Sequence, residues 1–311
     1  MASQMTNRSP GNWALGGRPE KHVDIPITAV FLVLFMIGAA SHMTIFQLNR
    51  RRGHKFIFSV VLFGFCMARI VSCILRIAST SLPTNANLAI AAAVFVGAAT
   101  LILFIINLLW SQRILRSLHP GFGWHPITSA GFKILYVLTG LTLVISITAT
   151  VQSLLTVNPK IRATDRSLQL YGQTFLAVMS SLPILVVFIA LIMPRRGSPD
   201  KFGSGRMSTK IIVLLAGSAL VTLGAWYRCG TSWQTPVPRS RPLPGYFSKP
   251  AFYIFNFGVE VLTIYLYAIM RVDLRFHVPN GAKGPGSYEI QAQNRVGDSA
   301  DTTEVDKEMQ G

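Results

Sequence analysis

The stretch FNFGVEVLTIYLYAIMRVD, residues 255–273, is almost entirely apolar and is long enough to cross a lipid bilayer as a helix. A transmembrane helix needs about 20 mainly apolar residues. Glu260 lies near the middle of the stretch, where a charged group costs on the order of 2.5–3.5 kcal/mol on insertion scales. The stretch therefore predicts a membrane helix whose carboxylate faces a partner or a wet cavity.

Six further segments share this length and apolar character. Half of the 311 residues are hydrophobic and only 13% are charged, whereas soluble domains carry about 25% charged residues. The chain is therefore predicted to be an all-α integral membrane protein, a bundle of seven transmembrane helices. The helices are expected at roughly residues 25–48, 56–79, 88–110, 130–157, 170–193, 209–227 and 251–270.

Two polar segments flank this membrane domain, which we place at residues 25–280. Residues 1–24 form a polar tail without the apolar core of a signal peptide. Residues 281–311 are Gly-rich and then acidic and polar, a composition typical of a disordered tail. Three cysteines without a CxxC spacing predict no disulfide framework, although a single bond between Cys73 and Cys229 is conceivable.

The basic residues indicate an orientation. The net charge of +17 raises the question of a nucleic-acid partner, but the Lys and Arg residues fall in short blocks between apolar runs. That pattern is typical of loops that face an anionic leaflet, so we expect membrane lipids and no nucleic acid as partners. The first loop, RRRGHK (50–55), is basic and the second, 79–87, has no Lys or Arg. This predicts the N-terminus outside and the C-terminus in the cytoplasm, although the sixth loop, 228–250, is also basic.

Arg69 is the predicted partner of Glu260. At 1.5 Å per residue, Arg69 lies about 20 Å and Glu260 about 15 Å from the inner ends of their helices. Polar residues around Glu260 recur at three- and four-residue steps, so they share one helix face that should point inward. This predicted polar core comprises Arg69, Glu260, Asn256, Tyr253 and Thr263, and the face continues to Tyr267.

Three interpretations of this core stay open. The ion pair could only hold the bundle together, it could belong to a binding or transport site, or Glu260 could act as a membrane acid. The third is weakest because no other Asp or Glu lies within a predicted helix. We expect no enzyme, no catalytic residue, no cofactor and no metal. A softer stripe on the fourth helix, either packing or pore lining, comprises Thr139, Thr142, Ser146, Thr150 and Ser153.

Arg76 and Arg228 lie near the predicted outer ends of the second and sixth helices, with no acidic residue expected at their level. They would form a cationic mouth over a pocket lined by Tyr253, Asn256 and Trp226. Arg is suited to bidentate contact with a carboxylate or an anionic headgroup. The alternative is that both arginines reach to outer lipid headgroups as anchors.

Four long motifs resemble a family of fungal seven-helix membrane proteins. That family is filed under unknown function and is often labelled a family C-like G-protein-coupled receptor. The likeness runs from about residue 25 to 282, and a fainter one of layout connects the chain to fungal RTA-like lipid-translocating exporters. The motifs are ARIVSCILRI (68–77), INLLWSQRILRSLHPGFGWHP (106–126), YRCGTSW (227–233) and FYIFNFGVEVLTIYLYAIMRVDLRFHVPNG (252–281).

The resemblance implies a cytoplasmic interface, either an anchor and rigid turn or a docking site for a signalling partner. Its residues are Arg113, His119, Trp124, Arg271, Asp273 and Arg275. Further family positions present here are Arg69, Arg76, Asn107, Arg228, Cys229, Asn256 and Glu260.

The function that we expect is that of a receptor or sensor which recognises an amphipathic or anionic small molecule from the outer side. A large class C ectodomain cannot fit into a 24-residue N-terminus. The first alternative is a lipid or small-molecule translocator, and the second a membrane enzyme that uses Glu260 as an acid. We expect the plasma membrane rather than the vacuole or endoplasmic reticulum, and an external Asn7 in the chain's one glycosylation sequon.

Overall fold

The computed structural model describes residues 12–53, 56–194, 199–278 and 281–288, and the regular secondary structure in this part of the chain is helical apart from one isolated bridge between Asn12 and Pro238. Seven helices are long and apolar enough to cross a membrane. The elements are α1 (Lys21–Arg51), α2 (Ile57–Ser81), α3 (Ala86–Ala98), α4 (Leu101–Leu118), α5 (Pro120–Gly123), α6 (Pro126–Leu155), α7 (Pro159–Ile192), α8 (Met207–Trp233), η2 (Gly245–Phe247), α9 (Lys249–Tyr253), η3 (Ile254–Gly258), α10 (Val259–Ile269) and α11 (Val272–Arg275).

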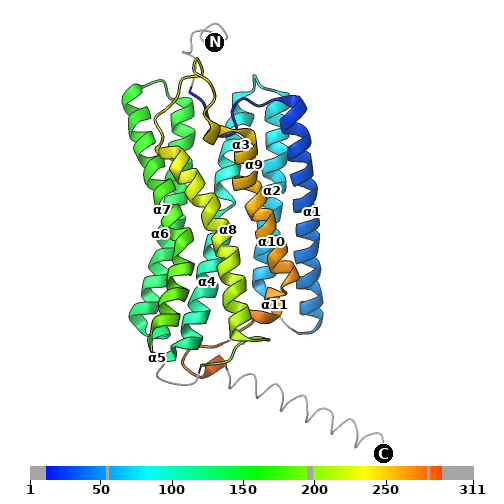
Figure 1. The fold of residues 1–311 in the computed structure, drawn as a ribbon, viewed down its shortest axis with the longest axis vertical. Helices are drawn as coiled ribbons and strands as arrows, with labels where there is room; N and C mark the ends of the chain where they lie inside the picture. The colour runs from blue at the N-terminus through cyan, green and yellow to red at the C-terminus, as the bar shows by residue number, and fades with distance from the viewer. Residues whose placement is uncertain (1–11, 54–55, 195–198, 279–280, 289–311) are drawn as a thin grey trace, which may run out of the picture.

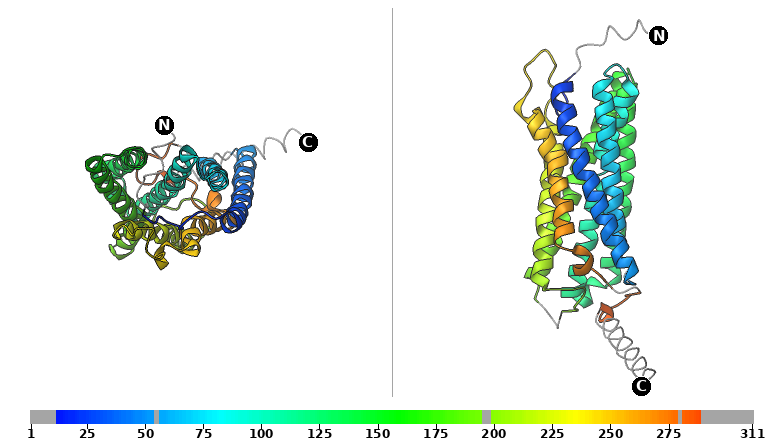
Figure 2. Two further views of the ribbon diagram at one scale, coloured as in Figure 1. Left: turned by 90° about the horizontal axis from the view of Figure 1, so that it is seen from above. Right: turned by 90° about the vertical axis from the view of Figure 1, so that its right-hand side faces the viewer.

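The long helices run side by side as an elongated bundle (Figure 1). We call the end where α1 begins the amino end and the end where α11 lies the carboxyl end. Helices α6 and α7 lie on one side of the bundle, α1 and α2 on the other, and α8 and α10 between them (Figures 1 and 2). The third span consists of α3 and α4, and the seventh of α9, η3 and α10.

Each predicted segment overlaps one of the seven spans and exceeds it by no more than one or two residues at an end, but several helices begin earlier than predicted. The fifth helix, predicted at 170–193, begins at Pro159 as α7. The Asn158 side chain accepts a hydrogen bond from the backbone N–H of Lys160, and proline at the first helical position suits the same start. Helix α1 begins at Lys21, which brings Asp24 into the helix.

The predicted tail does not begin at residue 281. Residues 281–288 follow the carboxyl end of the bundle, and Tyr288 is 2% exposed. Its ring lies 5.7 Å from that of Phe202, and the Gly286 N–H donates to Asp200 Oδ2 at 2.7 Å. The remainder of the predicted tail, 289–311, lies outside the described residues, as does Asn7.

Candidate functional site

The third span is interrupted where it passes Arg69. Helix α3 ends at Ala98 and α4 begins at Leu101, with Ala99 and Thr100 in a turn between them. Arg69 Nη1 donates to the Val96 carbonyl oxygen at 2.9 Å. The Thr100 hydroxyl lies in the middle of the bundle, where it meets side chains of three other spans.

Arg69 and Glu260 form the predicted ion pair, since Arg69 Nη2 donates to Glu260 Oε1. Thr100 joins them. Its hydroxyl donates to the same Oε1 at 2.7 Å and accepts from Arg69 Nη2 at 2.8 Å. Arg69, Thr100 and Glu260 are each at most 2% exposed, so the network is shielded from solvent.

Arg228 is the fourth member. Its Nη1 donates to the Thr100 hydroxyl at 2.9 Å, and the residue is 9% exposed. We call Arg69, Thr100, Arg228 and Glu260 the cationic cluster, because it holds two guanidinium groups and one carboxylate. In the part of the chain that the structure describes, Arg228 has no acidic group within ion-pair distance. One buried positive charge is therefore left without a counter-charge.

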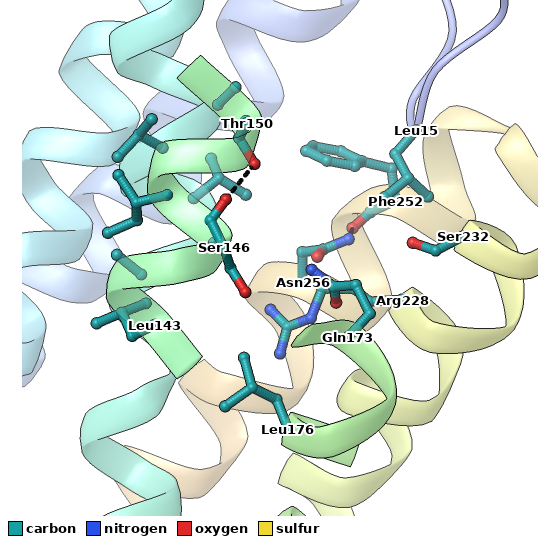
Figure 3. A pocket seen from close by; sticks show the side chains of 16 residues that line it. Leu15, Leu143, Ser146, Thr150, Gln173, Leu176, Arg228, Ser232, Phe252 and Asn256 are labelled. Carbon is teal, nitrogen blue, oxygen red and sulfur yellow. Dashed lines mark hydrogen bonds between the residues drawn. The ribbon is translucent and has the colours of Figure 1, made fainter. Parts of the chain in front are cut away.

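A cavity of about 210 Å³ opens beside Arg228. Arg228 and Asn256 lie on one side, and Ser146 and Thr150 of α6 face them from the other (Figure 3). The wall is completed by α3, by α7 and by Leu15 from the segment before α1. The Oδ1 of Asn256 and the Oγ of Ser146 are buried without a hydrogen-bond partner, so the cavity holds polar groups that a bound molecule could satisfy.

Two local features of the sequence place Arg228 and Asn256. Residues Ile254–Gly258 form a turn of π-helix, a rare wide turn that is often found at functional sites. The Asn256 side chain in this turn donates to the Phe252 carbonyl oxygen at 2.9 Å. Gly224 lets α8 approach the same turn, because a Cβ there would lie 2.5 Å from the Phe255 carbonyl oxygen. Arg228 follows one turn later on α8.

The predicted cationic mouth is wrong in one respect: Arg76 has an acidic partner. Arg76 Nη2 lies 3.1 Å from Asp24 Oδ1, and Lys249 Nζ lies 2.8 Å from Asp24 Oδ2. Tyr253 also donates to Asp24 Oδ1, at 2.8 Å. Because α1 begins at Lys21, the Asp24 carboxylate reaches the depth of Arg76.

The mouth residues are therefore divided between two places. Arg76 belongs to the Asp24 group at the amino end, whereas Arg228 reaches inward to the cationic cluster. Tyr253 bonds to Asp24 and is not part of the cavity wall. Trp226 does not line it either, since its ring is half exposed and its Nε1 donates to Ser181 Oγ at 2.9 Å.

The other predicted stripes face inward, but only part of them reaches the cavity. Thr263 is fully buried and donates to the Val259 carbonyl oxygen of its own helix at 2.7 Å. The hydroxyl of Tyr267 donates to Asn107 Oδ1 at 2.5 Å. On α6, Thr139 and Thr142 are buried and Ser153 accepts from Gln169, while Ser146 and Thr150 line the cavity.

Arg113, His119 and Trp124 lie at the carboxyl end in separate contacts. Arg113 donates to the Phe276 carbonyl oxygen and lies 4.7 Å from the centre of the Phe58 ring. His119 Nε2 is 2.7 Å from the Ala190 carbonyl oxygen. The Arg116 guanidinium lies 4.2 Å from the centre of the Trp124 ring, and the Tyr288 ring lies 5.6 Å from it, centre to centre.

Asp273 is the acceptor for Arg271 at the carboxyl end, and Arg275 lies beside them with a partner of its own. The Asp273 carboxylate accepts from Arg271 Nη2 at 2.9 Å and from Asn49 Nδ2 at 2.7 Å. Burial alone raises the pKa of the Asp273 carboxyl, but the hydrogen bonds from Arg271 and Asn49 outweigh it and hold the pKa below its ordinary value. Arg275 donates to the Met270 carbonyl oxygen at 2.7 Å, so both arginines have internal partners.

Sequence reasoning missed Thr100 and Asp24. The run Gly97-Ala98-Ala99-Thr100 of small residues could have pointed to an interruption, and Ile25-Pro26 after Asp24 could have pointed to a helix start. The structure also answers the cysteine question, because Cys73 and Cys229 are both free and buried. No group of three or more His, Cys, Asp or Glu within the described residues could hold a metal ion.

Comparison with known proteins gives one match. The family model described as "Protein of unknown function (DUF3112)" matches residues 200–277, a region that includes Arg228, Asn256 and Glu260. No curated protein and no solved structure matches the chain. Residues 200–277 are therefore similar to a family of unknown function, in a helical chain with the seven apolar spans of a multi-pass membrane protein.

Proposed function

We propose that this chain is a receptor-like or sensor-like membrane protein that binds a small acidic, amphipathic molecule in the cavity beside Arg228. The observation that carries the proposal is the unbalanced charge of the cationic cluster. The cluster holds two buried guanidinium groups, on Arg69 and Arg228, and a single carboxylate, Glu260, which among the described residues pairs directly with Arg69 alone. A buried charge without a counter-charge is costly, so an acidic ligand would stabilise the site.

The polar groups of the cavity suit such a ligand. An anionic oxygen is a strong acceptor for a guanidinium donor. The free Oδ1 of Asn256 accepts a hydrogen bond, and the Ser146 hydroxyl both donates and accepts. Arg228 and the Ser146 hydroxyl can therefore both donate to the oxygens of an acidic head, and a head that also carries a hydroxyl would satisfy the Asn256 oxygen as well.

The proposal takes the amino end as the outer face, as the charges of the first two loops indicate. Toward the carboxyl end an aromatic layer fills the bundle: Trp110 lies 4.9 Å from Tyr267 and 4.6 Å from Phe276, ring centre to ring centre. A ligand bound beside Arg228 would contact α8 and η3. Helix α8 and the continuation of η3, α10, both extend to the carboxyl end of the bundle, so they would transmit a shift toward the inner face. This layer favours a receptor over a channel-like path.

A translocator is the second candidate, and one observation favours it. Two spans are irregular next to the same cluster, the third at Thr100 and the seventh in the π-turn Ile254–Gly258. Interrupted helices that surround a buried polar site are typical of secondary transporters. Glu260 acts in both candidates as a counter-ion, because its Oε1 accepts from Arg69 and Thr100.

Binding and translocation are tested on the purified protein in lipid. A thermal-shift series should show stabilisation by hexadecanoate and none by hexadecanol, which has the same chain without the charge. In liposomes, an impermeant quencher reports how fast a fluorescent acidic lipid crosses from the outer to the inner leaflet. A receptor should not accelerate this crossing. Accelerated movement would favour the translocator, and equal shifts with acid and alcohol would refute the acidic ligand.

A further inference from the structure

The amino end of the cavity is covered by residues 12–17, which we call the strap. Trp13 N–H donates to the Val237 carbonyl oxygen at 2.8 Å, and its Nε1 donates to that of Arg241 at 2.8 Å. Leu15 then forms part of the cavity wall. Gly16 has a φ of +81°, and a Cβ there would lie 3.0 Å from Phe252, so the strap lies tightly over the bundle.

The side of the cavity between α3 and α6 is more open than the amino end, which the strap covers. Nine of its sixteen lining residues belong to α3 and α6. Among the described residues no hydrogen bond joins these two helices. On α3, Ala93 and Gly97 line the cavity and are also exposed on the surface of the bundle. A Cβ built on Gly97 meets no atom within 4 Å, so the wall is thin here.

An apolar groove leads to this thin wall. It runs along α6 from Ile147 to Thr156, where Ile147, Val151 and Leu155 alternate with Thr148, Gln152 and Thr156, and Ile147 also lines the cavity. The eight helical steps from Ile147 to Leu155 span about 12 Å. Its side chains face the surroundings of the bundle, where a membrane helix meets lipid. Ile147 thus connects the lipid-facing surface to Arg228.

The volume limits what the cavity holds. At about 210 Å³ it is smaller than the roughly 300–1,000 Å³ of ordinary small-molecule sites. It accommodates an acidic head and the first carbons of a chain, and the rest of the molecule has to lie outside. The groove on α6 is the apolar surface next to it.

We infer that the ligand is a single-chain acidic amphiphile, which enters from the lipid between α3 and α6 and leaves its chain in the α6 groove. The inference rests on the proposed function and adds the ligand class and its route. The head lies between Arg228 and Asn256, and the strap stays closed while the ligand enters. A carboxylate and a monoalkyl phosphate share this chemistry.

The test uses the full chain in lipid nanodiscs and a 16-carbon fatty acid with a photoreactive diazirine in mid-chain. Cross-links are expected on residues 147–155 of α6 and are expected to be lost in Arg228→Gln. Gly97→Leu fills the gap in the wall and should slow labelling at least about tenfold, because it blocks the route of association. Gly64→Leu is the matched control, since Gly64 is an exposed helix glycine whose Cβ would also meet open space.

A second variant, Asn12→Cys/Pro238→Cys, ties the strap to the sixth loop across the bridge between these residues. Labelling should be equally fast in its oxidised and reduced forms. Two results would overturn the lateral route while labelling still depends on Arg228: an unchanged rate in Gly97→Leu, or loss of labelling when the strap is closed by the disulfide. Labelling that is the same in Arg228→Gln as in the wild type would instead refute the proposed function. A lysophosphatidate probe of equal chain length shows whether the carboxylate or the phosphate head is preferred.

Discussion

Replacing Glu260 with Gln removes the one carboxylate of the cationic cluster and leaves two buried guanidinium groups, on Arg69 and Arg228, facing each other across Thr100. Breaking a buried pair by removing one partner costs about 3–5 kcal/mol. At roughly 2–4 °C per kcal/mol for larger domains, the thermal midpoint should fall by roughly 6–20 °C.

Removing the basic partner of the pair should cost less than removing the acidic one. Arg69→Gln removes one guanidinium and leaves Arg228 and Glu260, a balanced pair that Thr100 already bridges. Glu260→Gln should therefore lower the thermal midpoint more than Arg69→Gln does, although each removes one partner of the same ion pair. The double variant should be less damaged than the sum of the two single losses.

The assay is thermal unfolding of the purified protein in one detergent, followed by tryptophan fluorescence, to which the fully buried Trp110 contributes. Glu20→Gln is the matched control, since Glu20 is 61% exposed in its pair with Lys249. An exposed pair contributes at most about 1 kcal/mol. Equal losses for Glu260→Gln and Arg69→Gln, or strict additivity in the double variant, would refute the unbalanced cluster.

The remaining predictions concern the two ends of the bundle. Asp24→Asn should destabilise the protein by roughly 3–5 kcal/mol in thermal unfolding, because Arg76 and Lys249 both lose their buried partner; a loss below about 1 kcal/mol would contradict this. The lowered pKa of Asp273 means that its contribution is present above its ordinary value of 3.8 and is lost at more acidic pH, so the difference between wild type and Asp273→Asn should shrink below about pH 4. Burial raises the pKa of Tyr288 above its ordinary 10.0, so stability should fall as the pH rises past 10 in the wild type and less in Tyr288→Phe; equal falls would contradict it.

Hydropathy predicted the seven spans because length and apolar composition decide them one segment at a time. The pairing of Arg69 with Glu260 was also predictable from the sequence, since the helical rise fixes the depth of each residue in its span. Both predictions need only regular helices. They did not depend on how the helices pack against one another.

The errors arise where a helix departs from that regularity. The segment around Thr100 is uniformly apolar and small, so a hydropathy window shows one continuous helix and hides the turn between α3 and α4. Asp24 was placed in a tail because its surroundings are polar, although α1 had already begun. A backbone position also says little about the reach of a long side chain, and Arg228 extends inward to Thr100.

The cavity was not predictable from the sequence. Its wall combines α3, α6, α7, α8, the seventh span and the strap, which are distant in the chain and meet only through tertiary packing. The sequence indicated Asn256 and Ser146 as members of polar faces, but not that these faces oppose each other across a space (Figure 3). The likeness of residues 200–277 to a family of unknown function adds no ligand.

The most direct measurement compares the two arginines that the sequence had placed together. The dissociation constant for hexadecanoate is measured on the nanodisc-embedded wild type, Arg228→Gln and Arg76→Gln. A hydrogen bond to a charged group is worth about 1.5–3 kcal/mol, so Arg228→Gln should weaken binding roughly 10- to 150-fold. Arg76→Gln should leave it unchanged, since Arg76 is held by Asp24 outside the cavity. Unaltered binding in Arg228→Gln, or an equal loss in Arg76→Gln, would contradict an acid-binding site at Arg228.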